Sequence, residues 1–192
     1  MSLAAYQEAQ LAMLRDSRRA WAYSRGDFGD LAARLTGLER ERLQSQGLDA
    51  GMALARKLHE GWRLTKLLTL LPRTFDVGDP ELLSRLVAEF WSATPPRSLY
   101  FESEAAEFAR IVTRNSPSGT LLHEVAVLEG ALLAAAGHRP NAVGQTTTVR
   151  LNRDPRDLMS GTAAVPLGDG AFETAIWSDE TGVHLSVRCV RP

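Results

Sequence analysis

Cysteine is almost absent from this sequence, because Cys189 is the only one among 192 residues. A disulfide within the chain is therefore excluded, and we expect a reducing compartment, the cytoplasm. A chain of this length buries roughly 70% of the surface that its unfolded form exposes, so it can fold without a disulfide or a structural metal. The length allows one domain, or one domain with a small additional module.

An excess of one charge is also absent. Lysine and arginine number 22 against 23 aspartate and glutamate, which gives a formal net charge of −1. Proteins that follow a nucleic-acid backbone usually carry a basic excess on one face, so this composition disfavours nucleic-acid binding. Hydrophobic residues at 44% and charged residues at 23% are ordinary for a globular protein and indicate that the chain folds.

Long apolar runs are missing as well. No segment approaches the run of about 18 apolar residues that indicates a membrane-spanning helix. Near the N-terminus, Gln7, Glu8 and Gln10 stand where the apolar core of a signal peptide would lie. We therefore expect a soluble protein that is neither exported by a signal peptide nor inserted into a membrane.

The sequence changes in character near residue 140. Before it, Ala, Leu, Arg and Glu recur at helical spacing; after it, Thr, Val and Gly alternate with a period of two. This pattern predicts an α+β fold with an N-terminal multi-helix body, residues 1–140, and a small antiparallel β module, residues 141–192. The predicted helices cover residues 3–14, 28–35, a short segment after Thr36, 49–71, 80–91, 98–113 and 118–136.

Local signals fix several helix boundaries. Thr36 and Glu39 have the spacing of a capping box, in which each side chain binds the backbone N–H of the other residue. Pro72 ends the long helix 49–71. Apolar residues recur along that helix at three- and four-residue steps, at Leu54, Leu58, Trp62 and Leu68.

The predicted strands cover residues 145–151, 162–167, 171–177 and 183–190. Turn-forming residues at 168–170 and 179–182 separate the later strands, which predicts an antiparallel meander. In the last strand one face is expected to be buried, with Cys189 as a small core residue. This face carries Val183, Leu185, Val187 and Cys189.

The histidines lie on different predicted elements, and none has the HExxH or ExxH spacing of a metal site. They are His59, His123, His138 and His184. No GxSxG, P-loop or GxGxxG motif is present. We therefore expect no catalytic residue, metal or cofactor in this chain, and no enzymatic activity of its own. His123, Glu124 and Glu129 come nearest to a cluster, but a solvated helix face is the simpler interpretation.

A basic stripe follows the long helix. Its members are Arg56, His59, Arg63 and Lys66, which fall together at about 100° per residue. Such a stripe could attract an acidic peptide or an acidic partner. A charge run is more often simply the solvent face of a helix.

An acidic group lies on the predicted helix 98–113, where Glu102, Glu104 and Glu107 accompany aromatic residues. Paired carboxylates can perform acid–base chemistry when burial separates their pKa values, but spacing alone does not indicate that. We expect an amphipathic helix whose glutamates are solvated or form pairs with a partner subunit.

The β module leaves at least one edge strand with unpaired backbone N–H and C=O groups, because so small a sheet cannot close on itself. Neither 171–177 nor 183–190 contains proline, so each could accept an added peptide strand. The alternative is that the sheet only caps the helical core. The candidate peptide contacts are Ile176, Trp177, Leu185, Val187 and Arg188.

Three segments, taken in order, resemble a known family. They are LLPRT at residues 70–74, PRSLYFESEAAEF at 96–108 and LLHEVAVLEGA at 121–131. Together they resemble the partner subunits of multinuclear non-haem iron-dependent oxidative enzymes, which modify cysteines in ribosomally made peptides (RiPPs). The resemblance spans roughly residues 1–136. Length and the short β C-terminus are most similar to the MbnC group of methanobactin biosynthesis, with the related HvfC/BufC group as the alternative.

The resemblance implies a heterodimer with an iron-bearing TIM-barrel enzyme of the MbnB type, which uses oxygen to convert precursor cysteines to oxazolone and thioamide groups of a copper chelator. This chain would bind the leader of an MbnA-like precursor peptide in its β module, and the iron would belong to the partner. The helical body would dock the enzyme. The expected partner contacts are Arg56, Arg63, Arg73, Tyr100 and Glu104. The alternatives are a partner protein for another modified peptide and a DNA-binding regulator.

Overall fold

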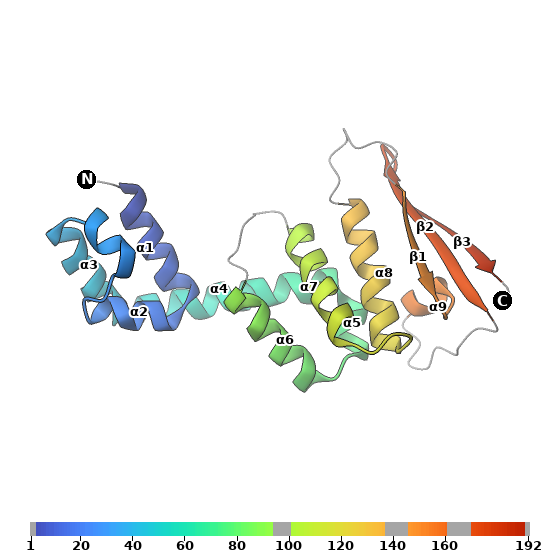
Figure 1. Cartoon of the computed structure of the whole chain (residues 1–192), viewed down its shortest axis with the longest axis horizontal. Helices are drawn as coiled ribbons and strands as arrows, with labels where there is room; N and C mark the ends of the chain where they lie inside the picture. The colour runs from blue at the N-terminus through green and yellow to red at the C-terminus, as the bar shows by residue number, and fades with distance from the viewer. Residues whose placement is uncertain (1–2, 94–100, 137–145, 161–169, 191–192) are drawn as a thin grey trace. The chain divides into compact units, whose positions relative to one another are not determined.

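The computed structural model describes residues 3–93, 101–136, 146–160 and 170–190 (Figure 1). Helices are followed by a three-stranded antiparallel sheet at the C-terminus, which confirms the predicted α+β class. The chain forms two compact units, Met1–Leu64 and Thr65–Pro192. The change of composition near residue 140 lies within the second unit.

The first unit is helical throughout. It contains α1 (Leu3–Arg15), α2 (Ser17–Ser24), the 3₁₀ helix η1 (Gly29–Arg34), α3 (Gly37–Gly47) and the first turns of α4 (Ala50–Leu70). The predicted capping box begins α3: Glu39 N donates to Thr36 Oγ1 at 3.3 Å and Thr36 N donates to Glu39 Oε2 at 2.8 Å. Helix α2 was not predicted. The buried apolar side chains of this unit come from α1, α2, α3 and η1 with its flanking residues, and they are Ala5, Ala9, Met13, Ala20, Tyr23, Phe28, Leu31, Leu35 and Leu43.

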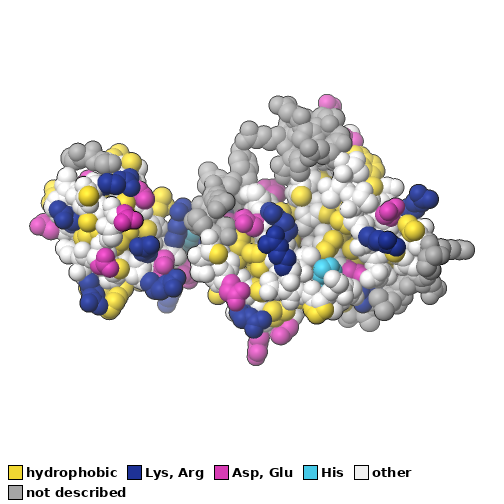
Figure 2. All heavy atoms as spheres, in the orientation of Figure 1, with side chains coloured by type: hydrophobic (Ala, Val, Ile, Leu, Met, Phe, Trp, Pro, Cys, Tyr) yellow, Lys and Arg dark blue, Asp and Glu magenta, His cyan; other side chains and the backbone are white. Residues whose placement is uncertain are grey.

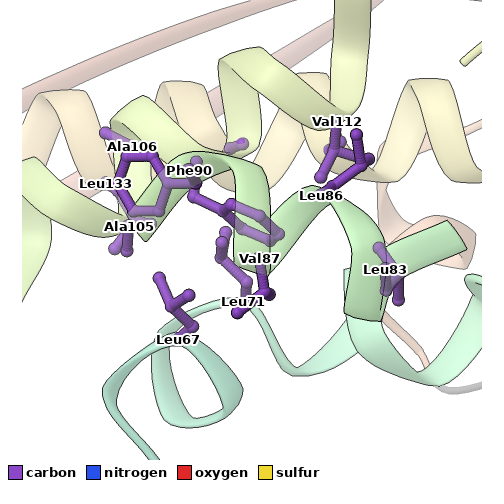
Figure 3. Close-up of a cluster of buried hydrophobic side chains, with 13 residues drawn as sticks. Leu67, Leu71, Leu83, Leu86, Val87, Phe90, Ala105, Ala106, Val112 and Leu133 are labelled. Carbon is purple, nitrogen blue, oxygen red and sulfur yellow. The ribbon is translucent and has the colours of Figure 1, made fainter. Parts of the chain in front are cut away.

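Helices α5 (Pro72–Val77), α6 (Pro80–Ala93), α7 (Phe101–Asn115) and α8 (Leu121–Ala136) form most of the second unit. Pro72 ends α4 as predicted, and it is also the first residue of α5. A backbone N–H at this position would have no partner within the helix, so proline, which lacks the N–H, fits there. Figure 3 shows the core that α6 and α7 build with the end of α4 and with α8. Phe108 is fully buried in this core, stacked on Phe75 at 5.8 Å and tilted against Phe90 at 5.6 Å between ring centroids.

The sheet consists of β1 (Thr147–Leu151), β2 (Ala171–Asp179) and β3 (Gly182–Val190), and the short helix α9 (Pro155–Met159) follows β1. The strand order is β1-β2-β3 with both pairs antiparallel, so the predicted meander is confirmed for these three strands. The predicted strand 162–167 lies outside the described residues, as do Tyr100 and His138. In Figure 1, α8 runs beside the sheet and α9 lies against its lower part.

A third cluster of buried side chains joins this sheet to α8 and α9. Its members are Val125, Leu128, Ala131, Ala135, Leu151, Leu158 and Ile176. Helix α8 therefore packs on α7 with one side and on the sheet with another. This explains why its sequence is apolar almost all round, a pattern that indicates a buried helix.

Candidate functional site

The strand order decides which backbone edge is open. Strand β2 lies in the centre: its residues 172–176 pair with β1 on one side, and its whole length pairs with β3 on the other. The prediction that β2 could accept an added strand is therefore wrong for residues 172–176, because both of their backbone edges are already used. Among the described strands, the outer edges belong to β1, with five residues, and β3, with nine.

The two predicted peptide contacts on β2, Ile176 and Trp177, lie on opposite faces of the sheet. Ile176 is fully buried beneath α8, so it cannot contact a peptide by its side chain, and that prediction is wrong. Trp177 lies on the opposite face of the sheet, half-buried, with its ring stacked on His184 at 5.5 Å and 21°. Because β3 lies between Trp177 and the open edge, Trp177 can influence a peptide at that edge only through His184.

Strand β3 carries an apolar face that the helices cover incompletely. Leu185 is directly opposite Ile176, and Val187 is directly opposite Thr174, so both point to the side of α8. Yet Val183 is 40% and Leu185 37% exposed, whereas Ile176 and Thr174 on β2 are 0% exposed. The expectation that this face is buried, with Cys189 in the core, is wrong, since Cys189 is exposed too. Toward the β3 edge, the described helices therefore cover this apolar face only in part.

The other face of the sheet carries a row of alternating charge. Arg150 on β1 is opposite Glu173 on β2, which is opposite Arg188 on β3, and all three side chains are exposed. Directly opposed residues of opposite charge stabilise a pair of strands by roughly 0.2–1 kcal/mol. The row ends at Arg188, so the predicted contact Arg188 does lie at the open edge.

The β2–β3 hairpin is held at its closed end by polar side chains. Asp179 Oδ1 accepts hydrogen bonds from Thr181 Oγ1 at 2.6 Å and Thr181 N at 2.7 Å, and it lies 2.8 Å from His184 Nε2. The hydrogen bond from the Thr181 hydroxyl, followed by that from His184, holds the pKa of Asp179 far below its usual value. Thr181 Oγ1 also contacts His184 at Nε2, at 2.9 Å. In a proton relay of the Ser-His-Asp kind, the two partners of the histidine bind different ring nitrogens. Here Thr181 and Asp179 both lie at Nε2 of His184, so the cluster holds the hairpin closed and does not have the geometry of a relay.

Two buried glutamates of α8 tie this helix to its neighbours, Glu129 to α5 and Glu124 to the end of β1. Glu129 is 3% exposed and accepts three hydrogen bonds at the first turn of α5, from Arg73 N at 3.0 Å, Thr74 N at 2.8 Å and Thr74 Oγ1 at 2.7 Å. Burial is the largest influence on its carboxyl group and raises the pKa of Glu129 despite these three donors. Glu129 thus satisfies backbone groups that a helix N-terminus leaves without partners.

Glu124 performs the corresponding task at the end of β1. Its Oε1 accepts from Asn152 N at 2.9 Å, and its Oε2 lies 3.3 Å from Arg153 Nη1, which is an ion pair without hydrogen-bond alignment. Arg153 Nη1 also donates to Gly119 O at 2.8 Å. The interpretation of Glu124 and Glu129 as a solvated face is wrong. The signal that identifies them is the apolar sequence on all sides of them, because a carboxylate in such a helix must be paired.

The predicted partner contacts are scattered. Arg73 is 7% exposed, and its guanidinium binds Leu158 O at 3.1 Å and pairs with Asp76, so it is a structural residue and not a surface contact. Arg63 is 4% exposed, and Arg56 donates to Met13 O at 3.2 Å, so the basic stripe is not a solvent face either. Glu104 is half-buried on α7, and Tyr100 lies outside the described residues.

The surface charges form no field of one sign in the view of Figure 2, where basic and acidic side chains are interspersed. Across the described parts of the chain, no three His, Cys, Asp or Glu side chains come together as metal ligands would. None of the described helices is both long and apolar enough to span a bilayer. No protein-family model, curated protein or solved structure matches the chain.

Proposed function

We propose that this chain is a peptide-binding subunit without a reactive centre of its own, and that it takes a segment of a precursor peptide as a fourth strand beside β3. The observation that carries the proposal is the outer edge of β3: nine residues long, free of proline and bordered by the exposed apolar side chains of Val183 and Leu185. Natural proteins usually protect such an edge with proline, a bulge or inward charges.

The geometry supports a division of labour within the site. Backbone pairing along β3 would supply affinity for any extended segment, and the side chains of alternate residues would supply selectivity. On the α8 side, Leu185 and Val187 would be covered by apolar side chains of the added strand. On the other side, Arg188 ends a charge row and would meet the outward-facing side chains.

Strand β1 is the competing edge, and it fits less well. It has five residues, and its inward-facing Leu151 is already 1% exposed, so an added strand would bury little further apolar surface there. An added strand on β3 would cover side chains that are now 37–40% exposed. Burial of apolar area is the main favourable term in association, which favours β3.

The resemblance to partner subunits of iron-dependent oxidative enzymes supplies the rest of the proposal. The chemistry, conversion of peptide cysteines to oxazolone and thioamide groups, would occur at iron in a TIM-barrel partner. This chain would contribute positioning, which can be worth several kcal/mol when it holds a reacting group near its target. The first and third resembling segments meet through Glu129 and the α5 N-terminus. We propose that they fix the sheet on the helices.

The test uses affinity selection of a randomised 12-residue peptide library on the immobilised full chain, followed by proline variants. Neighbouring residues of a strand direct their N–H groups to opposite sides, so one of Val187→Pro and Arg188→Pro removes an outward donor and the other removes a bond to β2. Circular dichroism and thermal unfolding identify the variant that keeps the sheet. That variant should lose selected peptides, whereas Val149→Pro on β1 should keep them if it folds.

A selection that yields no binder, or binders that the folded β3 proline variant retains fully, would contradict the proposal. Val187→Thr is the matched control, because it keeps the backbone donor and the β-branched shape. It should retain binding within about threefold, a change smaller than 1 kcal/mol.

A further inference from the structure

Arg188 is the only lysine, arginine, aspartate or glutamate in β3. Its side chain is exposed and lies at the outer edge of the sheet, on the face away from α8. It stands directly opposite Glu173, yet its side chain makes no ion pair or hydrogen bond within the part of the chain that the structure describes. A guanidinium carries five N–H donors, so Arg188 retains its binding capacity for a group from outside the chain.

The charges across this face follow an order from strand to strand. They are positive on β1, negative on β2 and positive on β3, at Arg150, Glu173 and Arg188. A strand added beside β3 would place one residue directly opposite Arg188, with the two Cβ atoms about 4.5–5.5 Å apart. At such a position opposite charges stabilise the pair of strands and like charges destabilise it. The row therefore favours aspartate or glutamate at this position of the added strand.

The other face of the sheet determines which residues stand beside the acidic one. Successive side chains of a strand point to opposite faces, so the neighbours of the acidic residue point to the α8 side. There Val187, Leu185 and Val183 follow at every second position of β3, and Leu185 and Val183 are 37% and 40% exposed. Apolar residues at every second position of the peptide would cover them. The acidic residue would precede these apolar residues in an antiparallel strand and follow them in a parallel one.

We propose that Arg188 is the residue that selects the peptide, and that the segment bound at β3 has an acidic residue next to a run of alternating apolar residues. This role rests on the proposed function, because it concerns the same edge. Arg150 ends the charge row at the outer edge of β1 and is exposed as well. Its neighbour Leu151 is already buried, so β1 offers the charge with less apolar surface to cover. Arg150 is therefore the matched control for Arg188.

The test uses peptides from the library selection, each synthesised with glutamate, glutamine or lysine at the shared acidic position. Their affinities for the full chain are measured by fluorescence anisotropy at low ionic strength, with a reductant because Cys189 is exposed. The glutamate form should bind the wild type roughly 3- to 30-fold more tightly than the lysine form, since the exchange replaces an attraction by a repulsion. Arg188→Glu should reverse this order, and Arg188→Gln should bring the two forms within about twofold. Arg150→Glu should keep the wild-type preference.

Circular dichroism checks that each variant keeps its sheet, and Arg188→Gln carries the test if the glutamate introduced opposite Glu173 disturbs the fold. Selected peptides that share no acidic residue, or a glutamate preference that both Arg188 variants keep, would overturn the role of Arg188 and leave the proposed function standing. A preference that Arg150→Glu reverses and Arg188→Glu keeps would place the peptide on β1 and overturn both proposals. A selection without any binder would also overturn both.

Discussion

Removal of the Glu129 carboxylate should cost more stability than any other single polar substitution in the second unit. Glu129→Ala leaves three buried donors without an acceptor: the amides of Arg73 and Thr74, and the Thr74 hydroxyl. Thr74 is 0% and Arg73 7% exposed, so water cannot readily replace the carboxylate. Each unsatisfied buried donor costs about 1–3 kcal/mol, and neighbouring losses are less than additive. We therefore expect a loss of roughly 3–6 kcal/mol.

The assay is native-state hydrogen exchange of the α8 amides, which reports the free energy of opening of this part of the chain separately from the first unit. Thr74→Val removes only the hydroxyl donor, so it should cost about 1 kcal/mol and serve as the graded comparison. Glu60→Ala, at an exposed glutamate of α4, should change the α8 exchange by less than about 0.5 kcal/mol. A loss of less than about 1 kcal/mol for Glu129→Ala would refute the assignment of Glu129 as the cap of α5.

Three further predictions concern single residues. Thr36→Ala should destabilise the first unit by about 1 kcal/mol in urea unfolding, because it removes the observed capping box of α3; an unchanged midpoint would contradict this. Gly61→Ala should raise the stability of the chain by about 1 kcal/mol, measured by thermal unfolding, since the added Cβ meets open space. Because burial raises the pKa of Glu129, its ionisation opposes folding. The stability of the wild type relative to Glu129→Gln should be greatest below the ordinary glutamate pKa, and it should fall as the pH rises through the raised pKa of Glu129. A stability difference in favour of the wild type that grows with pH would refute the direction of this pKa shift.

The sequence predicted the fold class because its signals are local. The capping box of α3 depends on Thr36 and Glu39 alone, and the β2–β3 hairpin depends on turn residues and on two-residue alternation. Helix α2 escaped because its signals are short: eight residues capped by Asp16, whose side chain accepts from Arg18 N at 2.8 Å. A segment of this length has little periodicity to recognise.

The placement of the site could be predicted only in part, because burial depends on what covers each face. Alternation along β3 correctly places Leu185 and Val187 on one face, but the register alone shows that β2 is central and that Ile176 is buried. On α4, the periodicity identifies two faces without showing which is covered. The leucine face is exposed, while Arg63 on the other is 4% exposed. The long side chains of arginine allow such burial of their aliphatic parts.

The measurement that tests the peptide-binding proposal most directly is amide exchange along β3, recorded residue by residue with and without a selected peptide. Binding as an added strand should slow exchange at alternate residues between Gly182 and Val190, because only every second N–H points outward, and should leave β1 unchanged. A peptide that binds the chain but slows no amide of β3 would contradict the account.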